Sequence, residues 1–148
     1  MLPFQTILVP TDFSADAEAA TQQAIEIAKT AGARVHLLHV YHLPAYVGSP
    51  YGYTYPANLF DDIQKNAAEQ LKEVELKVKA EGVEVTSNVV EGPPSERIVE
   101  YADRENADLI IIGTRGLTGL KHVFLGSVAE RTLRHAGCPV MTVKAPSN

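Results

Sequence analysis

Residues 109–116 read Leu-Ile-Ile-Ile-Gly-Thr-Arg-Gly, a compact aliphatic run that gives way at once to glycine. Such a run bounded by turn residues predicts a strand buried on both faces, which is typical of a parallel sheet covered by helices. After nine more residues the chain reads Gly-Ser-Val-Ala-Glu at 126–130, where a helical pattern begins. The stretch therefore predicts a strand, a glycine-containing loop and a helix in succession.

Outward from this stretch, short apolar runs alternate with longer helical patterns along the whole chain, which predicts strands joined by helical crossovers. Ser14 is a candidate helix cap and Gly32 a helix stop, and Asn58 and Gly82 are placed in the same way around a second, longer helix. The predicted strands are 6–9, 35–40, 83–90, 109–112 and 140–143, and the predicted helices are 15–31, 58–81, 93–105 and 127–135. We expect one α/β domain over residues 1–148, a doubly wound, five-stranded parallel sheet with helices on both faces.

Polar and apolar residues alternate in the predicted strand 83–90. Val83, Val85 and Val89 fall on one face, and polar side chains such as Glu84 and Asn88 fall on the other. A strand in the middle of a parallel sheet is apolar on both faces, so this one is predicted to lie at an edge.

Composition narrows the function classes. The 148 residues carry a net charge of −5, and the basic residues are scattered rather than clustered, which argues against nucleic-acid partners. The single cysteine, Cys138, excludes an internal disulfide framework and suits a reducing compartment. No apolar run is long enough for a membrane span, and the first residues lack the pattern of a signal peptide. We therefore expect a cytoplasmic protein without membrane insertion.

The loop that begins at Gly113 has the composition of an anion site. Glycine lets a backbone approach a ligand closely and adopt positive φ, and the helix that follows adds unpaired N–H groups and the positive end of its dipole. No lysine completes a P-loop here, and no Gly-x-Gly-x-x-Gly follows the first strand. Phosphate is the expected ligand, and the loop that would bind it is neither a P-loop nor a dinucleotide-binding motif.

At these residues the chain resembles the ATP-binding branch of the universal stress protein family. That branch carries Gly-x2-Gly-x9-Gly followed by Ser or Thr, and Gly113, Gly116, Gly126 and Ser127 match it without insertion. The resemblance extends to 9–12, 39–40, 107–113 and 138–143, so it spans nearly the whole chain. Only the segment 42–57, rich in Tyr and Pro, finds no counterpart.

The resemblance implies the strand order 3-2-1-4-5, which makes the first and fourth strands a topological switch point where ligands bind. It implies ATP as ligand, with Mg²⁺ or Mn²⁺ carried on the phosphates, and a homodimer paired through Val140–Val143 that acts on an unidentified protein partner. Adenine and ribose would be contacted by Pro10, Thr11, Asp12 and Val40. Ribose and phosphates would be held by Gly113, Arg115, Gly116, Gly126, Ser127, Val128 and Ala129.

Local structural roles compete with these assignments. Ser127 and Glu130 have the spacing of a capping box, in which both side chains satisfy helix N–H donors. Asp12 has the position of a turn residue beside Ser14. Among the loop cations, Lys121 and His122 are expected to be solvated, and only Arg115 is predicted to reach phosphate.

The histidines and the cysteine are not expected to carry chemistry. His36 and His39 lie three apart in a strand and so face opposite sides, and His42 follows the strand end. A metal site needs converging ligands, so no dedicated site is predicted. Cys138 precedes a strand in an apolar context and is expected to be a buried, inert thiol.

Three functions remain after the motifs are assigned. No catalytic constellation stands out, so the first hypothesis is a regulatory protein in which nucleotide occupancy is the signal and hydrolysis is slow. The second is an ATP-splitting or adenylyl-transferring enzyme on the same scaffold, which the Pro-Thr-Asp-Phe-Ser at 10–14 disfavours, since adenylating relatives carry Ser-Gly-Gly-x-Asp-Ser there. The third is a nucleotide-free interaction module. Segment 42–57 is predicted either to cover the ligand end of the sheet or to dock a partner.

Overall fold

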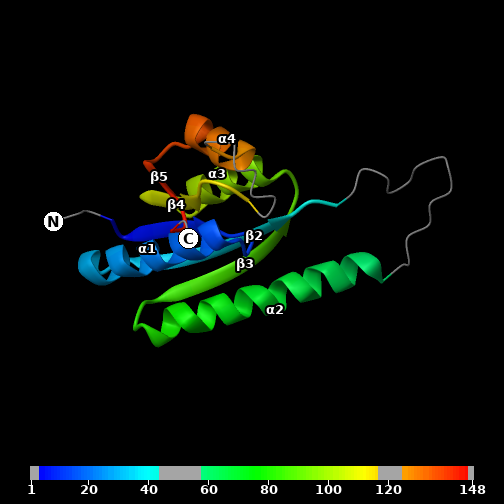
Figure 1. Ribbon diagram of the computed structural model, residues 1–148, viewed down its shortest axis with the longest axis horizontal. Helices are drawn as coiled ribbons and strands as arrows, with labels where there is room; N and C mark the ends of the chain where they lie inside the picture. Colours follow the sequence, from blue (N-terminus) through cyan, green and yellow to red (C-terminus); the bar gives the residue numbers. More distant parts are fainter. Residues whose placement is uncertain (1–3, 44–57, 117–124, 147–148) are drawn as a thin grey trace.

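A five-stranded parallel sheet forms the centre of the protein, with helices on both of its faces (Figure 1). The structure is a computed structural model that describes residues 4–43, 58–116 and 125–146. The strands lie in the order β3-β2-β1-β4-β5, which confirms the predicted topology. The described elements are β1 (Thr6–Pro10), α1 (Ala15–Ala31), β2 (Arg34–Tyr41), α2 (Leu59–Ala80), β3 (Val85–Glu91), α3 (Pro94–Arg104), β4 (Leu109–Gly113), α4 (Ser127–His135) and β5 (Val140–Val143).

The two central strands, β1 and β4, pair directly, with Leu8 opposite Ile110. Every residue of β1 is buried, and so are residues 109–112 of β4. Because successive strand residues point to opposite faces, strands covered on both sides need uninterrupted apolar runs, and these two strands have them. The chain leaves β1 into α1 on one face of the sheet and leaves β4 toward α4 on the other. Their carboxyl ends therefore form the switch point that the resemblance implied.

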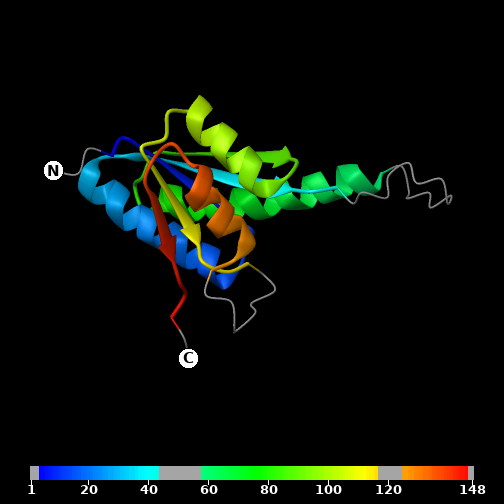
Figure 2. The same cartoon turned by 90° about the horizontal axis from the view of Figure 1, so that it is seen from above.

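Each face of the sheet has its own helix layer, as Figures 1 and 2 show together. Helices α1 and α2 cover one face, and α3 and α4 cover the other. The side chains buried under α1 and α2 include Ile7, Val9, Val35, Leu37 and Ile111, and those under α3 and α4 include Leu8, Leu38, Ile110 and Ile112. The alternation of these numbers along each strand is the two-residue period of a pleated sheet.

The ends of α1 agree with the prediction. The Ser14 hydroxyl accepts a hydrogen bond from the N–H of Ala17 at 3.2 Å, and Gly32 closes the helix in the left-handed conformation with φ of 69°. Asn58 precedes α2 as predicted, but its side chain makes no cap hydrogen bond. Asn58 therefore occupies the predicted N-cap position, with an αR backbone (φ −92°, ψ 0°) rather than the extended one typical of side-chain caps.

The capping box predicted at the start of α4 does not form. Gly126 is the residue at the N-cap position, and Ser127 is already the first helical residue. Glu130 instead pairs with Arg134 one turn further on, at 2.6 Å. The Ser127 hydroxyl is therefore not committed to capping α4.

Strand β3 lies at one edge of the sheet, as its alternating pattern predicted. Thr86 and Asn88 are exposed, and Val85 and Val89 are half-buried against the α1 and α2 face. The strand begins at Val85 rather than Val83. Most of the Tyr- and Pro-rich segment, residues 44–57, lies outside the described residues, so the predictions for it stay predictions.

His36 and His39 project from opposite faces of β2, as predicted. His36 meets the ring of Tyr101 edge to face, and His39 stacks on Phe13 with ring centroids 4.6 Å apart. Within residues 4–43, 58–116 and 125–146, no group of three His, Cys, Asp or Glu residues is arranged to hold a metal ion. Cys138 is half-buried rather than fully buried, and burial followed by the charges of Asp103 and Asp108 raises the pKa of its thiol. The protonated, less reactive form is favoured.

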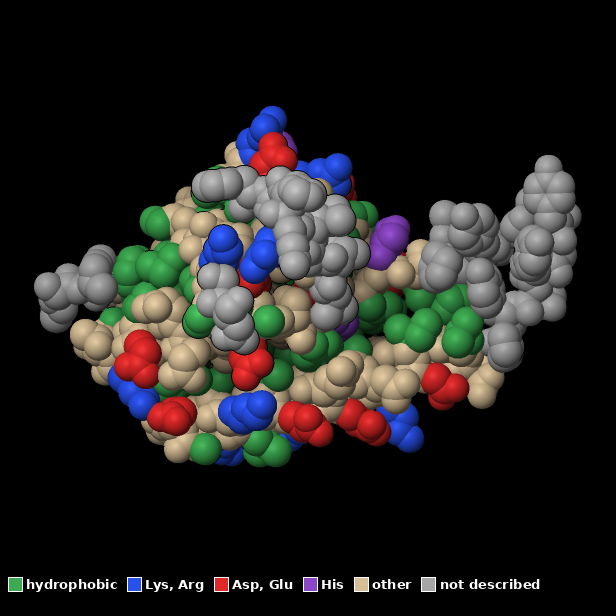
Figure 3. All heavy atoms as spheres, viewed as in Figure 1, with side chains coloured by type: hydrophobic (Ala, Val, Ile, Leu, Met, Phe, Trp, Pro, Cys, Tyr) green, Lys and Arg blue, Asp and Glu red, His purple; other side chains and the backbone are tan. Residues whose placement is uncertain are grey.

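Charged side chains of both signs are interspersed on the surface. On the face drawn in Figure 3, acidic and basic side chains alternate along the lower side, where α2 runs. None of the described helices is both long enough and apolar enough to cross a membrane.

Candidate functional site

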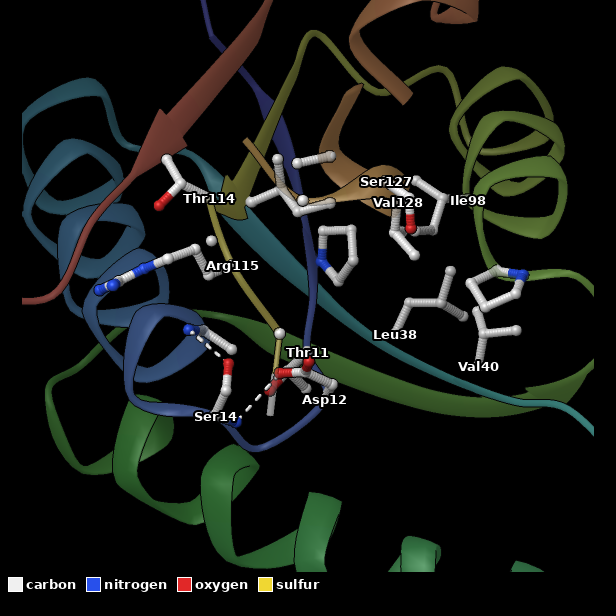
Figure 4. Close-up of a pocket in the computed structure, with 18 residues that line it drawn as sticks. Thr11, Asp12, Ser14, Leu38, Val40, Ile98, Thr114, Arg115, Ser127 and Val128 are labelled. Atoms are coloured by element: carbon white, nitrogen blue, oxygen red, sulfur yellow. Dashed lines mark hydrogen bonds between the residues drawn. The ribbon is translucent and has the colours of Figure 1, made fainter. Parts of the chain in front are cut away.

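All eleven residues predicted to bind nucleotide line one cavity of about 320 Å³ (Figure 4). The cavity lies at the carboxyl ends of β1, β2 and β4. Its wall is completed by the first residues of α3 and α4 and by the loop that leaves β4. Five separate parts of the sequence therefore converge where the switch-point rule places a ligand.

Hydrogen bonds within the loop between β1 and α1, and one bond to β2, hold this loop in place. The Thr11 N–H donates to the carbonyl of Leu38 at 2.8 Å, and the Thr11 hydroxyl accepts from the N–H of Phe13 at 3.0 Å. Phe13 has a φ of 67°, which is unusual for a side chain of its size and indicates a backbone constrained by its surroundings. One Asp12 oxygen, Oδ1, accepts from the N–H of Ser14 at 3.0 Å. The turn role and the cavity role of Asp12 therefore coexist.

At each of the three motif glycines an added Cβ would come close to other protein atoms, which are main chain at Gly113 and Gly126 and the end of a side chain at Gly116. A Cβ on Gly113 would lie 2.8 Å from the carbonyl carbon of Asp16, and one on Gly116 would lie 2.9 Å from Oδ2 of Asp12. A Cβ on Gly126 would lie 3.0 Å from the carbonyl oxygen of Thr114. None of the three has a positive φ. The observed close approach is to other parts of the protein, so the predicted close approach to a ligand stays a prediction, and the predicted positive φ is wrong for these three glycines.

The N-terminus of α4 forms one wall of the cavity. The Glu130 N–H donates to the carbonyl of Gly126 at 2.9 Å and is the first intrahelical donor. The N–H groups of Ser127, Val128 and Ala129 precede that bond, so they have no intrahelical acceptor. Together with the positive end of the helix dipole they offer an anion a set of fixed donors. The Ser127 hydroxyl, free of the capping role, borders the same space (Figure 4).

Arg115 lines the cavity, but its guanidinium is held on the buried carboxylate of Asp16. Nε and Nη2 lie 3.2 and 3.3 Å from the two Asp16 oxygens. Figure 4 shows the Arg115 side chain directed toward α1 and away from Leu38 and Val40. In this arrangement the Arg115 backbone N–H also donates to Asp16, at 3.0 Å, and the positive charge of the guanidinium is paired with that carboxylate. The prediction that Arg115 meets phosphate through its charge stays a prediction.

Asp16 is ionised at neutral pH despite its burial. Burial by itself would raise the pKa of this carboxyl, but the hydrogen bonds from Arg115, Ala145 and Thr114 outweigh it and lower the pKa to about 2. A carboxylate that accepts several hydrogen bonds while charged favours the charged form. The pair with Arg115 is therefore a charged one.

The opposite side of the cavity is apolar. Leu38 and Val40 of β2 and Ile98 of α3 line this side, and Figure 4 shows the three side chains on the side away from Arg115 and Asp12, with Ser127 and Val128 beside Ile98. A flat aromatic group gains from burial at such a surface, whereas a charged group does not. The cavity therefore has an apolar side and a side with anion-binding donors. A nucleotide likewise has an aromatic base and charged phosphates.

A model of the universal stress protein family matches residues 3–144. The chain belongs to that family. It is 38% identical over 143 residues to a universal stress protein of Methanocaldococcus jannaschii, covering 97% of this chain and 84% of the relative. The solved structure of the protein MJ0577, also a universal stress protein of Methanocaldococcus jannaschii, is similar with a TM-score of 0.86 at 31% identity, over 99% of this chain and all of the other.

Two further solved members of the universal stress protein family contain nucleotides. One is a complex with cAMP, similar with a TM-score of 0.72 at 27% identity over 97% of this chain and 99% of the other. The second, from Archaeoglobus fulgidus, is a complex with dAMP, with a TM-score of 0.67 at 27% identity over 97% of this chain and all of the other. The fold of this universal stress protein is therefore one on which other members hold adenine nucleotides.

Sequence reasoning missed part of the cavity wall of this universal stress protein. The additional lining residues are Ser14, Ala17, Leu38, Pro94, Ile98, Ile112 and Thr114. The strand period carried a signal for one of them, Leu38, since it shares one face of β2 with the predicted residue Val40. Lys121 and His122 lie outside the described residues.

Proposed function

We propose that this universal stress protein binds ATP in the cavity and that occupancy, rather than turnover, is its output to a partner protein. The observation that carries the proposal is the convergence of the β1 end, the β4 loop and the open N-terminus of α4 on one cavity. The dAMP and cAMP complexes of two relatives support an adenine nucleotide in this position.

The two ends of the cavity suggest how ATP would lie. The base would sit against Leu38, Val40 and Ile98, where burial of an aromatic ring is favourable. The Asp12 carboxylate is the one acidic side chain among the described lining residues, and it would accept from the ribose hydroxyls. The phosphates would meet the N–H groups at the start of α4 and the backbone of the β4 loop.

A divalent cation fits this site only as a companion of the nucleotide. Mg²⁺ usually keeps several waters and binds through substrate phosphates, and the one acidic side chain among the described lining residues, Asp12, is assigned to the ribose, so phosphate oxygens and water would hold the cation here. When bound, the cation would neutralise phosphate charge and leave the binding role of the protein groups unchanged. Mn²⁺ would bind through the same oxygen ligands.

The proposal that occupancy is the signal separates this protein from an ATP-consuming enzyme. The Thr11, Ser14 and Asp12 groups at the cavity are tied into the β1–α1 turn, which suits binding and orientation. Release of phosphate or pyrophosphate from ATP by the isolated protein is expected to be slower than one turnover per minute. Steady turnover of many ATP per minute without a partner would contradict the proposal.

The direct test identifies the ligand that accompanies the purified protein. The protein is denatured, the released small molecules are analysed by mass spectrometry, and Mg-ATP binding is measured by calorimetry on wild type, Gly126→Asp and Gly126→Asn. Aspartate and asparagine are both good N-cap residues and have the same shape, so α4 should form in each variant. Only aspartate places a negative charge beside the phosphates. We expect ATP binding in wild type, a weaker affinity in Gly126→Asn and no detectable binding in Gly126→Asp.

One outcome would contradict ATP binding, and another would contradict the placement of the phosphates at the start of α4. A wild type that carries no nucleotide and ignores added Mg-ATP would leave the loop with a structural role, and the nucleotide-free interaction module would then be favoured. Equal affinities in Gly126→Asp and Gly126→Asn would place the phosphates elsewhere, because the charge next to α4 would then be without effect.

We also propose that two copies pair through β5. This strand lies at the edge of the sheet, and β4 is its one neighbour among the described strands. The carbonyls of Pro139 and Val143 accept hydrogen bonds from the N–H groups of Ile110 and Thr114, so these two residues face β4. Backbone direction alternates along a strand, and the groups of Val140 and Thr142 therefore point outward, where an unprotected edge invites a second strand.

Thr142→Pro tests the pairing without cutting the bond to β4. Proline removes the outward N–H of an edge strand, a position where it is tolerated. We expect light scattering to show a dimer for wild type and for Thr142→Ser, and a monomer for Thr142→Pro. A dimer in all three would place the interface on another surface.

A further inference from the structure

Behind the cavity wall, Asp16 collects hydrogen bonds from two distant parts of the chain. It does not line the cavity, and its side chain is only 4% exposed. Its oxygens accept from the Thr114 hydroxyl at 2.8 Å, from the Arg115 N–H at 3.0 Å and from the Arg115 guanidinium. They also accept from the Ala145 N–H at 2.9 Å. Every one of these donors is more than ninety positions away from Asp16 in sequence.

The donors are not random surface groups. Thr114 and Arg115 are the two residues between the first two motif glycines, and Ala145 follows β5 by two residues. The Thr114 N–H donates in addition to the carbonyl of Val143 at 2.9 Å. Through the Asp16 carboxylate in its first turn, α1 therefore holds the start of the loop that leaves β4 and the segment that follows β5.

We propose that Asp16 is a positioning residue for the phosphate end of the nucleotide site. It fixes Thr114 and Arg115 against α1. Because the Thr114 carbonyl accepts from the Gly126 N–H, this also holds the N-terminus of α4, with its unpaired N–H groups, in place before ligand arrives. Donors that are already in place lose little entropy on binding, which raises affinity for the group they contact. The inference rests on the proposed function, because it assigns a role in the same site.

Whether ATP affinity rises or falls when Asp16 is replaced distinguishes a positioning role from a purely electrostatic one. Asp16 is a negative charge near the place where phosphates would bind, and it occupies the Arg115 guanidinium. If charge alone mattered, removing it would free a cation and strengthen ATP binding. If Asp16 positions the loop, removing it releases the backbone donors and weakens ATP binding.

Calorimetry with Mg-ATP and with adenosine distinguishes the two, on wild type, Asp16→Asn and Glu18→Gln. Glu18 is an exposed acid in the same first turn of α1, so Glu18→Gln removes the same charge without touching the loop. The loss of one charge-assisted hydrogen bond corresponds to roughly a tenfold change in affinity. We expect Asp16→Asn to bind ATP about tenfold more weakly and adenosine within about twofold of wild type. Glu18→Gln should match wild type for both ligands.

Thr114→Val supplies a milder variant, because it removes a single hydroxyl donor to Asp16 and keeps the side-chain shape. It should weaken ATP binding about threefold, and little further when combined with Asp16→Asn, since both changes cut the same bond. Full additivity in the double variant would mean that the hydroxyl contacts phosphate itself.

ATP binding by Asp16→Asn that equals or exceeds wild type would overturn the positioning role while the proposed function stands. An equal loss of ATP and adenosine binding would also overturn it, since a general structural defect does not select the phosphate end. If wild type binds neither ligand, the proposed function fails and the positioning role fails with it. Should Asp16→Asn not fold, Thr114→Val decides by the same split between ATP and adenosine.

Discussion

A methyl group added at Gly113 tests whether this glycine is present for the ligand or for the fold. Gly113→Ala would place a Cβ 2.8 Å from the Asp16 carbonyl carbon and 2.9 Å from the Ala17 nitrogen. Carbon atoms in contact prefer about 3.5–4.0 Å, so the strand end and the first turn of α1 must separate by a substantial fraction of an ångström. Both sides of this contact are main chain, and neither can rotate away.

Overpacking of this kind costs about 1–3 kcal/mol, and we expect about 2 kcal/mol for Gly113→Ala. In a protein of this size that loss lowers the melting temperature by about 4–8 °C. Gly116→Ala is the matched control, because its Cβ would meet the Oδ2 atom at the end of the Asp12 side chain, 2.9 Å away. That side chain can turn aside and lose at most its hydrogen bond to Ser14, so less than about 1 kcal/mol is expected.

Urea unfolding followed by circular dichroism measures both variants, with the slope of the transition checked for constancy. The expected order of stability is wild type, then Gly116→Ala, then Gly113→Ala. A Gly113→Ala protein within about 0.5 kcal/mol of wild type would refute the argument, because α1 and β4 would then have room that the structure does not show. Equal losses in the two variants would refute it as well.

Two further predictions concern pH and the start of α4. Burial lowers the pKa of His36, the charge of Glu105 opposes this less strongly and the charge of Arg34 adds to it, so the unfolded chain takes up a proton at a higher pH than the folded protein does. Stability should be full above the unfolded pKa of about 6.5 and fall as the pH decreases from 7 to 5, and the slope should be shallower in His36→Gln when urea midpoints are compared. Ser127→Ala should change stability by less than about 0.5 kcal/mol while weakening ATP binding in calorimetry, since its hydroxyl does not cap α4. A loss of about 1 kcal/mol would instead reveal a cap.

The sequence predicted the element order, the edge position of β3 and eleven of the residues that line the cavity, for identifiable reasons. Apolar runs such as 109–112 and the helical stripe of α1 are local patterns, and local patterns determine secondary structure within a few residues. The switch-point rule then brings Asp12 and Gly113 together without any knowledge of side-chain contacts. At the start of α4 the same local reasoning failed, because the spacing of Ser127 and Glu130 fits a capping box, whereas the helix begins one residue earlier than that box requires.

Arg115 illustrates what local patterns do not carry. A cation in a glycine-rich loop suits phosphate, solvent or a carboxylate equally well, and the choice depends on what the fold places beside it. Asp16 had no distinguishing local signal, since an acidic residue in the first turn of a helix is ordinary. Its partners, Thr114 and Ala145, lie 98 and 129 positions away along the chain.

The sequence by itself determined the kind of structure, the family and the end of the sheet at which a ligand would bind. These follow from periodicity and from motif spacing, which are properties of neighbouring residues. The tertiary structure alone decided that Gly113 makes room for α1, that Arg115 is held by Asp16 and that Leu38 and Ile98 form the apolar end of the cavity. The physical reason is that close packing and hydrogen bonding act between atoms that only folding brings together.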